Sequence, residues 1–198
     1  MRPLILASSS PSRALMLRNA GIAFEAVSAP VDESAVKAAM VAEAALPRDM
    51  ADALADLKAR RGAGRFPEAL VLGADQLLSC EGRIHDKPRD MDEAREQLQA
   101  LRGRTHELHA AAVVYEDGRP VWRHVGRAQL TMRPFGDEFL EAYLQSEDTA
   151  LLETVGGYRI EAAGAQLFSR VQGDLFTVMG LPLLELLGFL RTRGVVLE

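Results

Sequence analysis

The sequence predicts an α/β fold, because short apolar runs typical of buried strands alternate with segments that carry helix signals. Hydrophobic residues make up 48% of the 198 positions and charged residues 26%, proportions that are ordinary for a globular domain with its own core. No internal repeat, low-complexity tract or linker interrupts the alternation. We therefore expect residues 1–198 to form a single domain.

The chain opens with a predicted strand, a serine-rich loop and a helix. Residues 4–7 form the apolar run of a buried strand. Ser10 is the expected N-cap of a helix with Pro11 in its first turn and Gly21 just beyond its end. Such a helix start offers free N–H groups to an anion, and Arg13 would add charge. The alternative is an ordinary serine cap with a solvent-facing arginine.

The later elements follow from similar signals. Strands are predicted at residues 24–29, 69–72 with a continuation through 77–79, 106–115 and 121–132; helices are predicted at residues 36–61 with a break at Pro47, 90–101, 136–144 and 181–190. Asp49 is the expected cap after the break, and Asp90 with Asp92 caps the next helix. The Asp117-Gly118 pair between two apolar runs predicts a β-hairpin.

Charge and cysteine content exclude several classes of protein. Lys and Arg number 23 and Asp and Glu 28, so the net charge is −5, whereas a polynucleotide-binding protein usually carries a basic excess. Cys80 is the only cysteine and fits a reducing compartment. No apolar run approaches the roughly 18 residues of a membrane span. We expect a cytoplasmic protein that binds neither polynucleotide nor membrane.

Carboxylates after apolar runs are candidates for metal and acid–base chemistry. Asp75 is expected at a turn after four apolar or small residues, where a buried charge is costly without a partner. Asp32 and Glu33 come at a turn after a predicted strand, and a solvated turn is their alternative interpretation. One or two carboxylates together with substrate phosphates are a typical environment for Mg²⁺, and a carboxylate can also deprotonate water.

Two lysines are candidate phosphate ligands, and several motifs of other nucleotide-binding or hydrolytic sites are absent. Lys58 lies in an alanine-rich helical segment and Lys87 precedes a proline; either is a candidate phosphate ligand or a solvated surface lysine. The sequence contains no P-loop, no dinucleotide-binding glycine motif and no Gly-x-Ser-x-Gly. One His-x-x-His pair, His106 and His109, is weak evidence for zinc in a predicted strand.

Taken in order, these segments resemble the Maf family of nucleoside triphosphate pyrophosphatases over nearly the whole chain. The matching segments are Leu6-Ala7-Ser8-Ser9-Ser10-Pro11-Ser12-Arg13, Gly21-Ile22-x-Phe24, Asp32-Glu33, Leu54-Ala55-x-x-Lys58-Ala59, Gly73-Ala74-Asp75-Gln76, Lys87-Pro88, Gly156-x-Tyr158-x-Ile160-Glu161 and Gly180-Leu181-Pro182-Leu183. The resemblance implies two lobes, a mixed, twisted β-sheet flanked by helices and a central cleft, as in inosine-triphosphatase-like folds. It also implies a homodimer.

The resemblance implies hydrolysis of a nucleoside triphosphate between its α- and β-phosphates, with a divalent cation (Mg²⁺, Mn²⁺ or Co²⁺) as cofactor. Asp75 matches the family's proton acceptor, and Glu33 with Asp75 matches its metal site. The positions that match its phosphate-binding residues are Ser8, Ser10, Arg13, Lys58 and Lys87. Positioning and charge neutralisation dominate phosphoryl transfer, so such a set is suitable for this reaction.

Three positions are expected to affect which nucleotide base the protein binds. Ser12 stands where many family members have an arginine, and Gln76 and Glu161 differ from the residues of the dTTP/UTP group. Gln76 with Glu161 is more similar to the branch that acts on 7-methyl-GTP. His85-Asp86 and Thr154 depart from the common family pattern. Strict specificity for 7-methyl-GTP or for dTTP and UTP is therefore one alternative. A nucleotide-sensing regulator of cell division or septum formation, without turnover, is another.

Overall fold

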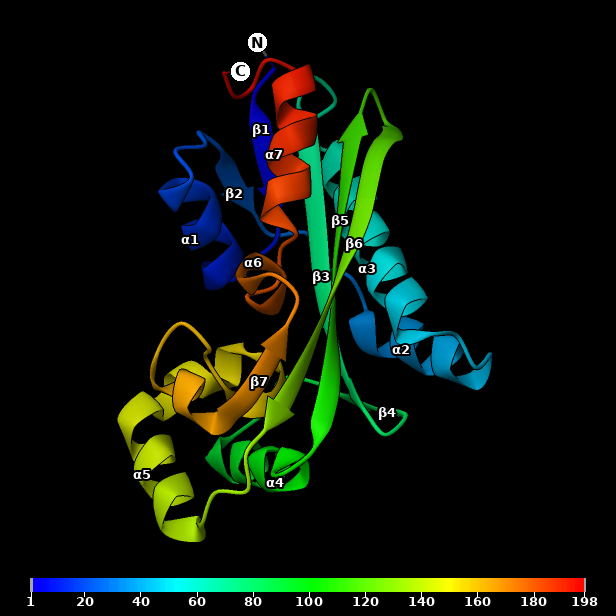
Figure 1. The fold of residues 1–198 in the computed structure, drawn as a ribbon. Coiled ribbons are helices and arrows are strands. Elements are labelled where there is room, and N and C mark those ends of the chain that lie inside the picture. The colour runs from blue at the N-terminus through cyan, green and yellow to red at the C-terminus, as the bar shows by residue number, and fades with distance from the viewer. Residues whose placement is uncertain (1, 198) are drawn as a thin grey trace. The chain divides into compact units, whose positions relative to one another are not determined.

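The computed structural model describes residues 2–197, within which a seven-stranded mixed sheet carries helices (Figure 1). The strands are β1 (Leu4–Ala7), β2 (Glu25–Val27), β3 (Leu70–Cys80), β4 (Arg83–His85), β5 (Thr105–Glu116), β6 (Arg119–Met132) and β7 (Phe168–Gln172). The helices are α1 (Pro11–Asn19), α2 (Glu33–Ala42), α3 (Pro47–Ala63), α4 (Met91–Leu101), α5 (Asp137–Glu147), α6 (Leu175–Val178) and α7 (Leu183–Thr192); three 3₁₀ segments are η1 (Asp148–Glu153), η2 (Val155–Gly157) and η3 (Ala163–Leu167).

The sheet follows the order β2-β1-β3-β5-β6-β7, with β4 paired to β3. Strand β1 runs parallel to β2 and β3, whereas the β3–β4 and β6–β7 pairs are antiparallel. All four residues of β1 are buried, as expected for a parallel strand covered on both faces. The predicted α/β class with a mixed sheet is confirmed; the cleft stays a prediction.

The chain divides into two compact units, which are described separately. Among the described residues, unit 1 comprises residues 2–76, 109–126 and 180–197, and unit 2 comprises residues 77–108 and 127–179. Strands β3, β5 and β6 contribute to both.

In unit 1, α3 lies directly against β3 at Gly73. A Cβ atom at this glycine would lie 2.2 Å from the carbonyl oxygen of Ala55 and 2.4 Å from the backbone nitrogen of Ala59. Only a hydrogen atom fits in that space, so the glycine permits contact between helix backbone and strand backbone. Asp75 follows two positions later and therefore points to the same face of the strand.

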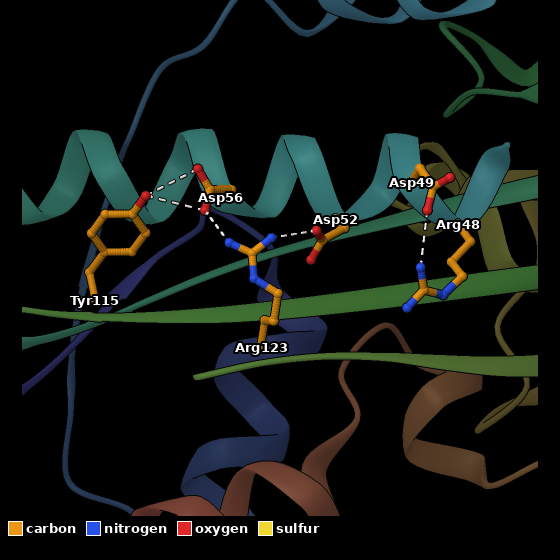
Figure 2. Close-up of polar contacts among 6 residues, drawn as sticks. All are labelled: Arg48, Asp49, Asp52, Asp56, Tyr115 and Arg123. Carbon is orange, nitrogen blue, oxygen red and sulfur yellow. Dashed lines mark hydrogen bonds and ion pairs between the residues drawn. The ribbon is translucent and has the colours of Figure 1, made fainter. Parts of the chain in front are cut away.

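Polar contacts also connect α3 to the strands of unit 1. Figure 2 shows Arg123 of β6 reaching the helix, where its Nη1 and Nη2 lie 2.6 Å from Asp52 Oδ2 and 2.9 Å from Asp56 Oδ1. The hydroxyl of Tyr115 donates to both oxygens of Asp56. In the first turn of α3, Arg48 pairs with Asp49 in the same figure.

Helix α7 covers the opposite face of this part of the sheet. Trp122, next to Arg123 on β6, stacks on Phe189 of α7 with ring centroids 5.5 Å apart. Because neighbouring residues of a strand point to opposite faces, α3 and α7 lie on different sides of β6, as Figure 1 also shows.

Unit 2 has its own apolar core, drawn from β3, α4, β6 and α5 and from the segments that follow. Leu98, Leu130 and Leu167 are among its completely buried members. His106 is buried in this core, and its Nε2 lies 2.9 Å from the hydroxyl of Tyr158. Burial lowers the pKa of His106 from 6.5 to about 4, with a smaller effect from His85. The imidazole is therefore neutral at physiological pH.

Most predicted elements are confirmed, with differences at helix starts. Ser10 caps α1, Pro11 is its first residue, and Gly21 follows with a φ of +73°. Asp90 caps α4, with Asp92 in the first turn. The prediction for Asp49 is wrong, because α3 begins at Pro47 and contains Asp49 in its first turn. Strand β7 and helix α6 were not predicted from the sequence.

No helix in the described part of the chain is long and apolar enough to cross a membrane. Cys80 is buried, and burial raises the pKa of its thiol.

Candidate functional site

The serine-rich loop after β1 provides hydrogen-bond acceptors for Arg13. Ser8 is buried, and its Oγ accepts hydrogen bonds from the Ser10 backbone nitrogen at 3.3 Å and from Arg13 Nη1 at 3.1 Å. Ser10 Oγ accepts from the Arg13 backbone nitrogen at 3.5 Å, and Arg13 Nε donates to the carbonyl oxygen of Gly180 at 2.8 Å. The predicted solvent-facing alternative for Arg13 is wrong.

Arg13 is a buried cation that is held by neutral oxygen atoms. Burial lowers the pKa of Arg13 below its ordinary value of 12.5, while the charges of Asp75 and Glu33 oppose this shift. A guanidinium keeps its proton under such conditions. The result is a positive group, fixed in orientation at a helix N-terminus, where an anion is favoured.

Lys58, Glu33 and Asp75 form what we call the lysine cluster. The Nζ atom of Lys58 lies 2.5 Å from Asp75 Oδ1 and 2.7 Å from Glu33 Oε1. Lys58 comes from α3 and Asp75 from the middle of β3, so the prediction that Asp75 lies at a turn is wrong. Glu33 is the first residue of α2, capped by Asp32, and not part of a solvated turn.

The two carboxylates of the lysine cluster have different surroundings. Burial opposes the charge of Glu33, but the hydrogen bond and charge of Lys58 outweigh it, so the pKa of Glu33 is below its ordinary value of 4.5. Asp75 is buried, and among residues 2–197 its Oδ2 has no hydrogen-bond partner. An unpaired buried oxygen costs roughly 1–3 kcal/mol, so Oδ2 is poised to accept from a ligand.

The donor set fits a hard divalent cation that is shared with a phosphate. Within the described residues no group of three or more His, Cys, Asp or Glu side chains gathers as a complete metal cage. Mg²⁺ does not need one, because it is usually held by one or two carboxylates, substrate phosphates and water. Glu33 and the unpaired Asp75 Oδ2 are oxygen donors of that kind. His106 and His109, three apart on β5, face opposite sides of the strand.

Two of the predicted specificity residues lie in unit 1. Ser12 is partly exposed in the first turn of α1, and Gln76 is partly buried next to Asp75 on β3. A Cβ atom at Gly180 would lie 3.3 Å from Gln76 Oε1 and 3.7 Å from Arg13 Nε. Gln76 and Arg13 are therefore close neighbours of the same glycine, whose φ is +102°.

The other predicted residues belong to unit 2. Lys87 is exposed, with its Nζ 3.4 Å from Glu153 Oε2. Glu161 belongs to what we call the arginine cluster, formed by Arg159, Glu147 and Glu161. Arg159 lies between the two carboxylates, with Nη1 3.2 Å from Glu147 Oε2 and Nε 3.4 Å from Glu161 Oε1.

The structure thus brings together Ser8, Ser10 and Arg13, and separately joins Lys58 with Glu33 and Asp75. The sequence analysis missed Arg159 and Glu147, because an arginine in a loop and a glutamate at the end of a helix carry no local signal for pairing. It also missed the carbonyl of Gly180, because a backbone acceptor from residue 180 has no sequence signature. Gly180 comes close to Gln76 and Arg13 only in the folded chain.

Comparison with known proteins places the chain in a family. The family profile described as Maf-like protein matches residues 3–193. A protein of Caulobacter vibrioides called nucleoside triphosphate pyrophosphatase is 52% identical over 196 residues, which cover 99% of this chain and 98% of that relative. One of Paramagnetospirillum magneticum with the same name is 52% identical over 190 residues, covering 96% and 98%.

A third relative has a more specific name. The 7-methyl-GTP pyrophosphatase of Rhizobium meliloti is 47% identical over 197 residues, covering 99% of both chains. The matches span the motifs that build the serine loop, the lysine cluster and the segment of Glu161. This chain belongs to the family of Maf-like proteins.

Proposed function

We propose that this protein is a nucleoside triphosphate pyrophosphatase, which hydrolyses a nucleotide to a nucleoside monophosphate and pyrophosphate. The observation that carries the proposal is Asp75, a buried carboxylate with one oxygen on Lys58 and the other unpaired among the described residues. A binding module has no need for an unpaired oxygen on a buried carboxylate, whereas a hydrolase needs an acceptor for the proton of water. The names of the full-length relatives support the same activity.

In the proposed reaction, Asp75 Oδ2 accepts a proton from a water molecule. The water oxygen forms a bond to the α-phosphorus, and the bond from that phosphorus to the bridging oxygen breaks. Pyrophosphate leaves with the bridging oxygen. Lys58, bound to Asp75 Oδ1, fixes the carboxylate so that its other oxygen serves as the base. Its ammonium also offsets the charge that develops in the transition state.

Arg13 and the hydroxyls of Ser8 and Ser10 are the proposed phosphate ligands in unit 1. The guanidinium is already fixed by Gly180 and Ser8, so binding a phosphate does not require it to be ordered, and a preorganised cation stabilises developing charge most effectively. Lys87 of unit 2 is proposed as a further phosphate ligand from its position in the family motif. Its pairing with Glu153 is exposed and weak, which leaves it available to a stronger anion.

We propose Glu33 and Asp75 as the protein ligands of a divalent cation, Mg²⁺, Mn²⁺ or Co²⁺. Such a cation, when bound, supplies positive charge that neutralises phosphate oxygens. Glu33 keeps its negative charge at neutral pH because its pKa is low. Lys58 already occupies one oxygen of each carboxylate, so a cation would be held by the other oxygen of Glu33 and by the lone pair of Asp75 Oδ2 that does not take the proton.

Ser12, Gln76 and Glu161 are the proposed determinants of the nucleotide base. Gln76 with Glu161 favours the 7-methyl-GTP branch, and one relative carries that name. We also expect action in the cytoplasm, consistent with a single buried cysteine, no binding to polynucleotides or membranes, and a homodimer as in the resemblance.

A product analysis with the full chain tests the proposal. The substrates are GTP, 7-methyl-GTP, ATP, CTP, UTP and dTTP, each assayed with Mg²⁺, Mn²⁺ or Co²⁺ and after chelation. Phosphorus NMR in ¹⁸O-labelled water should show pyrophosphate without label and a nucleoside monophosphate with label. Label in inorganic phosphate would refute attack at the α-phosphorus. Tight nucleotide binding without any product would favour the sensing role instead.

A further inference from the structure

Arg159 differs from the other cations of unit 2 because it connects a buried carboxylate with a carboxylate implicated in base selection. Glu147, at the end of α5, is buried and accepts hydrogen bonds from the Ala163 backbone nitrogen at 3.0 Å and from Arg159 Nη1 at 3.2 Å. Arg159 Nε then lies 3.4 Å from Glu161 Oε1. The side chain of Glu161 is thus linked through one arginine to a residue fixed in the core.

The backbone around Arg159 is fixed as well. Its nitrogen donates to the hydroxyl of Tyr143 at 3.3 Å, and its carbonyl oxygen accepts from the Ala162 nitrogen at 3.2 Å. A Cβ atom at Gly164 would lie 2.3 Å from that carbonyl oxygen, so the chain closes tightly on itself here. These contacts restrict the backbone of Arg159 to few conformations. Its planar guanidinium can pair with Glu147 and Glu161 at the same time.

We propose that Arg159 is a positioning residue for Glu161, and that it holds this carboxylate as the acceptor for the two adjacent N–H groups of a guanine-type base edge. This inference rests on the proposed function, in which Glu161 contributes to base selection. A carboxylate is an acceptor only, and two adjacent donors allow paired, charge-assisted hydrogen bonds. Uracil and thymine present one N–H group between two carbonyl oxygens, which a carboxylate repels. An orienting arginine therefore increases selectivity for guanine-type bases.

The test compares the selectivity of three variants with that of the parent protein. The readout is kcat/KM for GTP and 7-methyl-GTP divided by kcat/KM for UTP. Arg159→Met should reduce this ratio by roughly tenfold or more, through KM of the guanine nucleotides, with kcat for UTP nearly unchanged. Arg159→Lys keeps the charge but loses the fork, so it should restore only part of the ratio. Glu147→Gln, which keeps an acceptor for Ala163, should give an intermediate loss.

Arg95 provides a matched control in the same unit. It also bridges two carboxylates, Asp92 and Glu141, and its side chain is 34% exposed, compared with 35% for Arg159. Arg95→Met should leave the ratio unchanged. Equal losses for all nucleotides in the Arg159 variants would show a merely structural role and overturn the inference, as would an unchanged ratio or an equal effect of Arg95→Met.

A double variant and a binding assay complete the test. If Arg159 acts through Glu161, adding Arg159→Met to Glu161→Gln should lower the ratio no further; an additive loss would contradict the inference. Calorimetry with α,β-methylene analogues of GTP and UTP measures the same preference without turnover. A parent protein that is inactive but still prefers the guanine analogue would refute the proposed function and keep the inference. An active parent protein without a guanine preference would keep the proposed function and refute the inference.

Discussion

The lysine cluster of unit 1 and the arginine cluster of unit 2 each place one cation between two carboxylates, but they differ in burial. Lys58 and Asp75 have side chains 11% and 7% exposed. Arg159 is 35% exposed, although its anchor Glu147 is 6% exposed. Glu33 is 41% exposed, so solvent reaches that carboxylate of the lysine cluster. Lys58 and Asp75 have little water to stabilise their charges if a partner is removed, whereas Arg159 keeps access to solvent.

The difference suggests a division between chemistry and recognition. Electrostatic effects on a transition state are strongest where water is excluded, which favours the buried cluster as the place of bond breaking. A base must enter from solvent and exchange water for the protein's acceptors, which favours the more exposed cluster. The cations follow the same division, since a lysine is a compact point charge and an arginine holds planar groups in a set orientation.

The largest effect is expected from removing Asp75, the proposed proton acceptor of the lysine cluster. Asp75→Asn keeps the size of the side chain but removes the base, so kcat should fall by roughly 10²–10⁴-fold while the fold is retained. Pyrophosphate release and circular dichroism measure the two properties. Asp49→Asn, on the exposed start of α3, is the control and should keep full activity. Parental activity in a folded Asp75→Asn protein would disprove the role of Asp75.

Removing the cation of the lysine cluster should have a large effect on stability. Lys58→Met leaves two carboxylates facing each other, one of them buried, and should lower the free energy of unfolding by roughly 3–5 kcal/mol at pH 7. Mn²⁺ should then raise the stability of the variant more than that of the parent, because it can replace the missing charge. Urea denaturation with and without Mn²⁺ provides the measurement. Equal stabilisation of both proteins would argue against Glu33 and Asp75 as its ligands.

Acid should affect unit 2 before it affects the lysine cluster. His106 is neutral in the folded protein, with a pKa of about 4 against 6.5 when unfolded, so the unfolded chain takes up the proton first. Stability should therefore fall as the pH drops from 6.5 to about 4, by about 3 kcal/mol. Protonation of Glu33 lowers the stability further only below pH 4.5. Denaturation of His106→Gln across this range should show a smaller slope, with a remaining contribution from His85. An unchanged slope would contradict this assignment.

The smallest effect is expected from removing the cation of the arginine cluster. Arg159→Met should lower the free energy of unfolding by roughly 1–3 kcal/mol, because the buried Glu147 loses its cation but keeps the hydrogen bond from Ala163, and the pair with Glu161 is partly solvated. The same denaturation assay compares this value directly with that of Lys58→Met. A loss as large as that of Lys58→Met would mean that both clusters are equally dependent on their cations, and the comparison above would fail.

Local sequence signals explain how much of the fold was predictable. The apolar run of β1, the Ser10 cap and the Asp117-Gly118 turn depend on neighbouring residues, so they were predicted closely. Helix α3 started two residues before the predicted cap, because Pro47 is itself suited to the first helical position. Strand β7 was missed because its residues are mostly exposed and show no apolar alternation.

The pairings of the candidate site residues were not predictable from the sequence. Lys58 was expected to bind phosphate, yet the structure shows it between Glu33 and Asp75, which come from separate segments of the chain. Such contacts depend on packing between α2, α3 and β3, which no local pattern encodes. The arginine cluster was missed for the same reason, since Glu147 gains its importance from burial and not from its neighbours in sequence.

The absence of a side chain at Gly73 has a consequence for how this protein can diverge. Backbone contact between α3 and β3 fixes the distance from the helix to the strand, so substitutions among the surrounding core side chains cannot easily change it. Substitutions elsewhere in the chain therefore have little effect on the spacing between Lys58 and Asp75. In the arginine cluster, Gly164 fixes the backbone of Arg159 but not the spacing between its side chain and Glu161. Preference for the base can therefore evolve, or be redesigned, while the proposed hydrolytic residues keep their spacing.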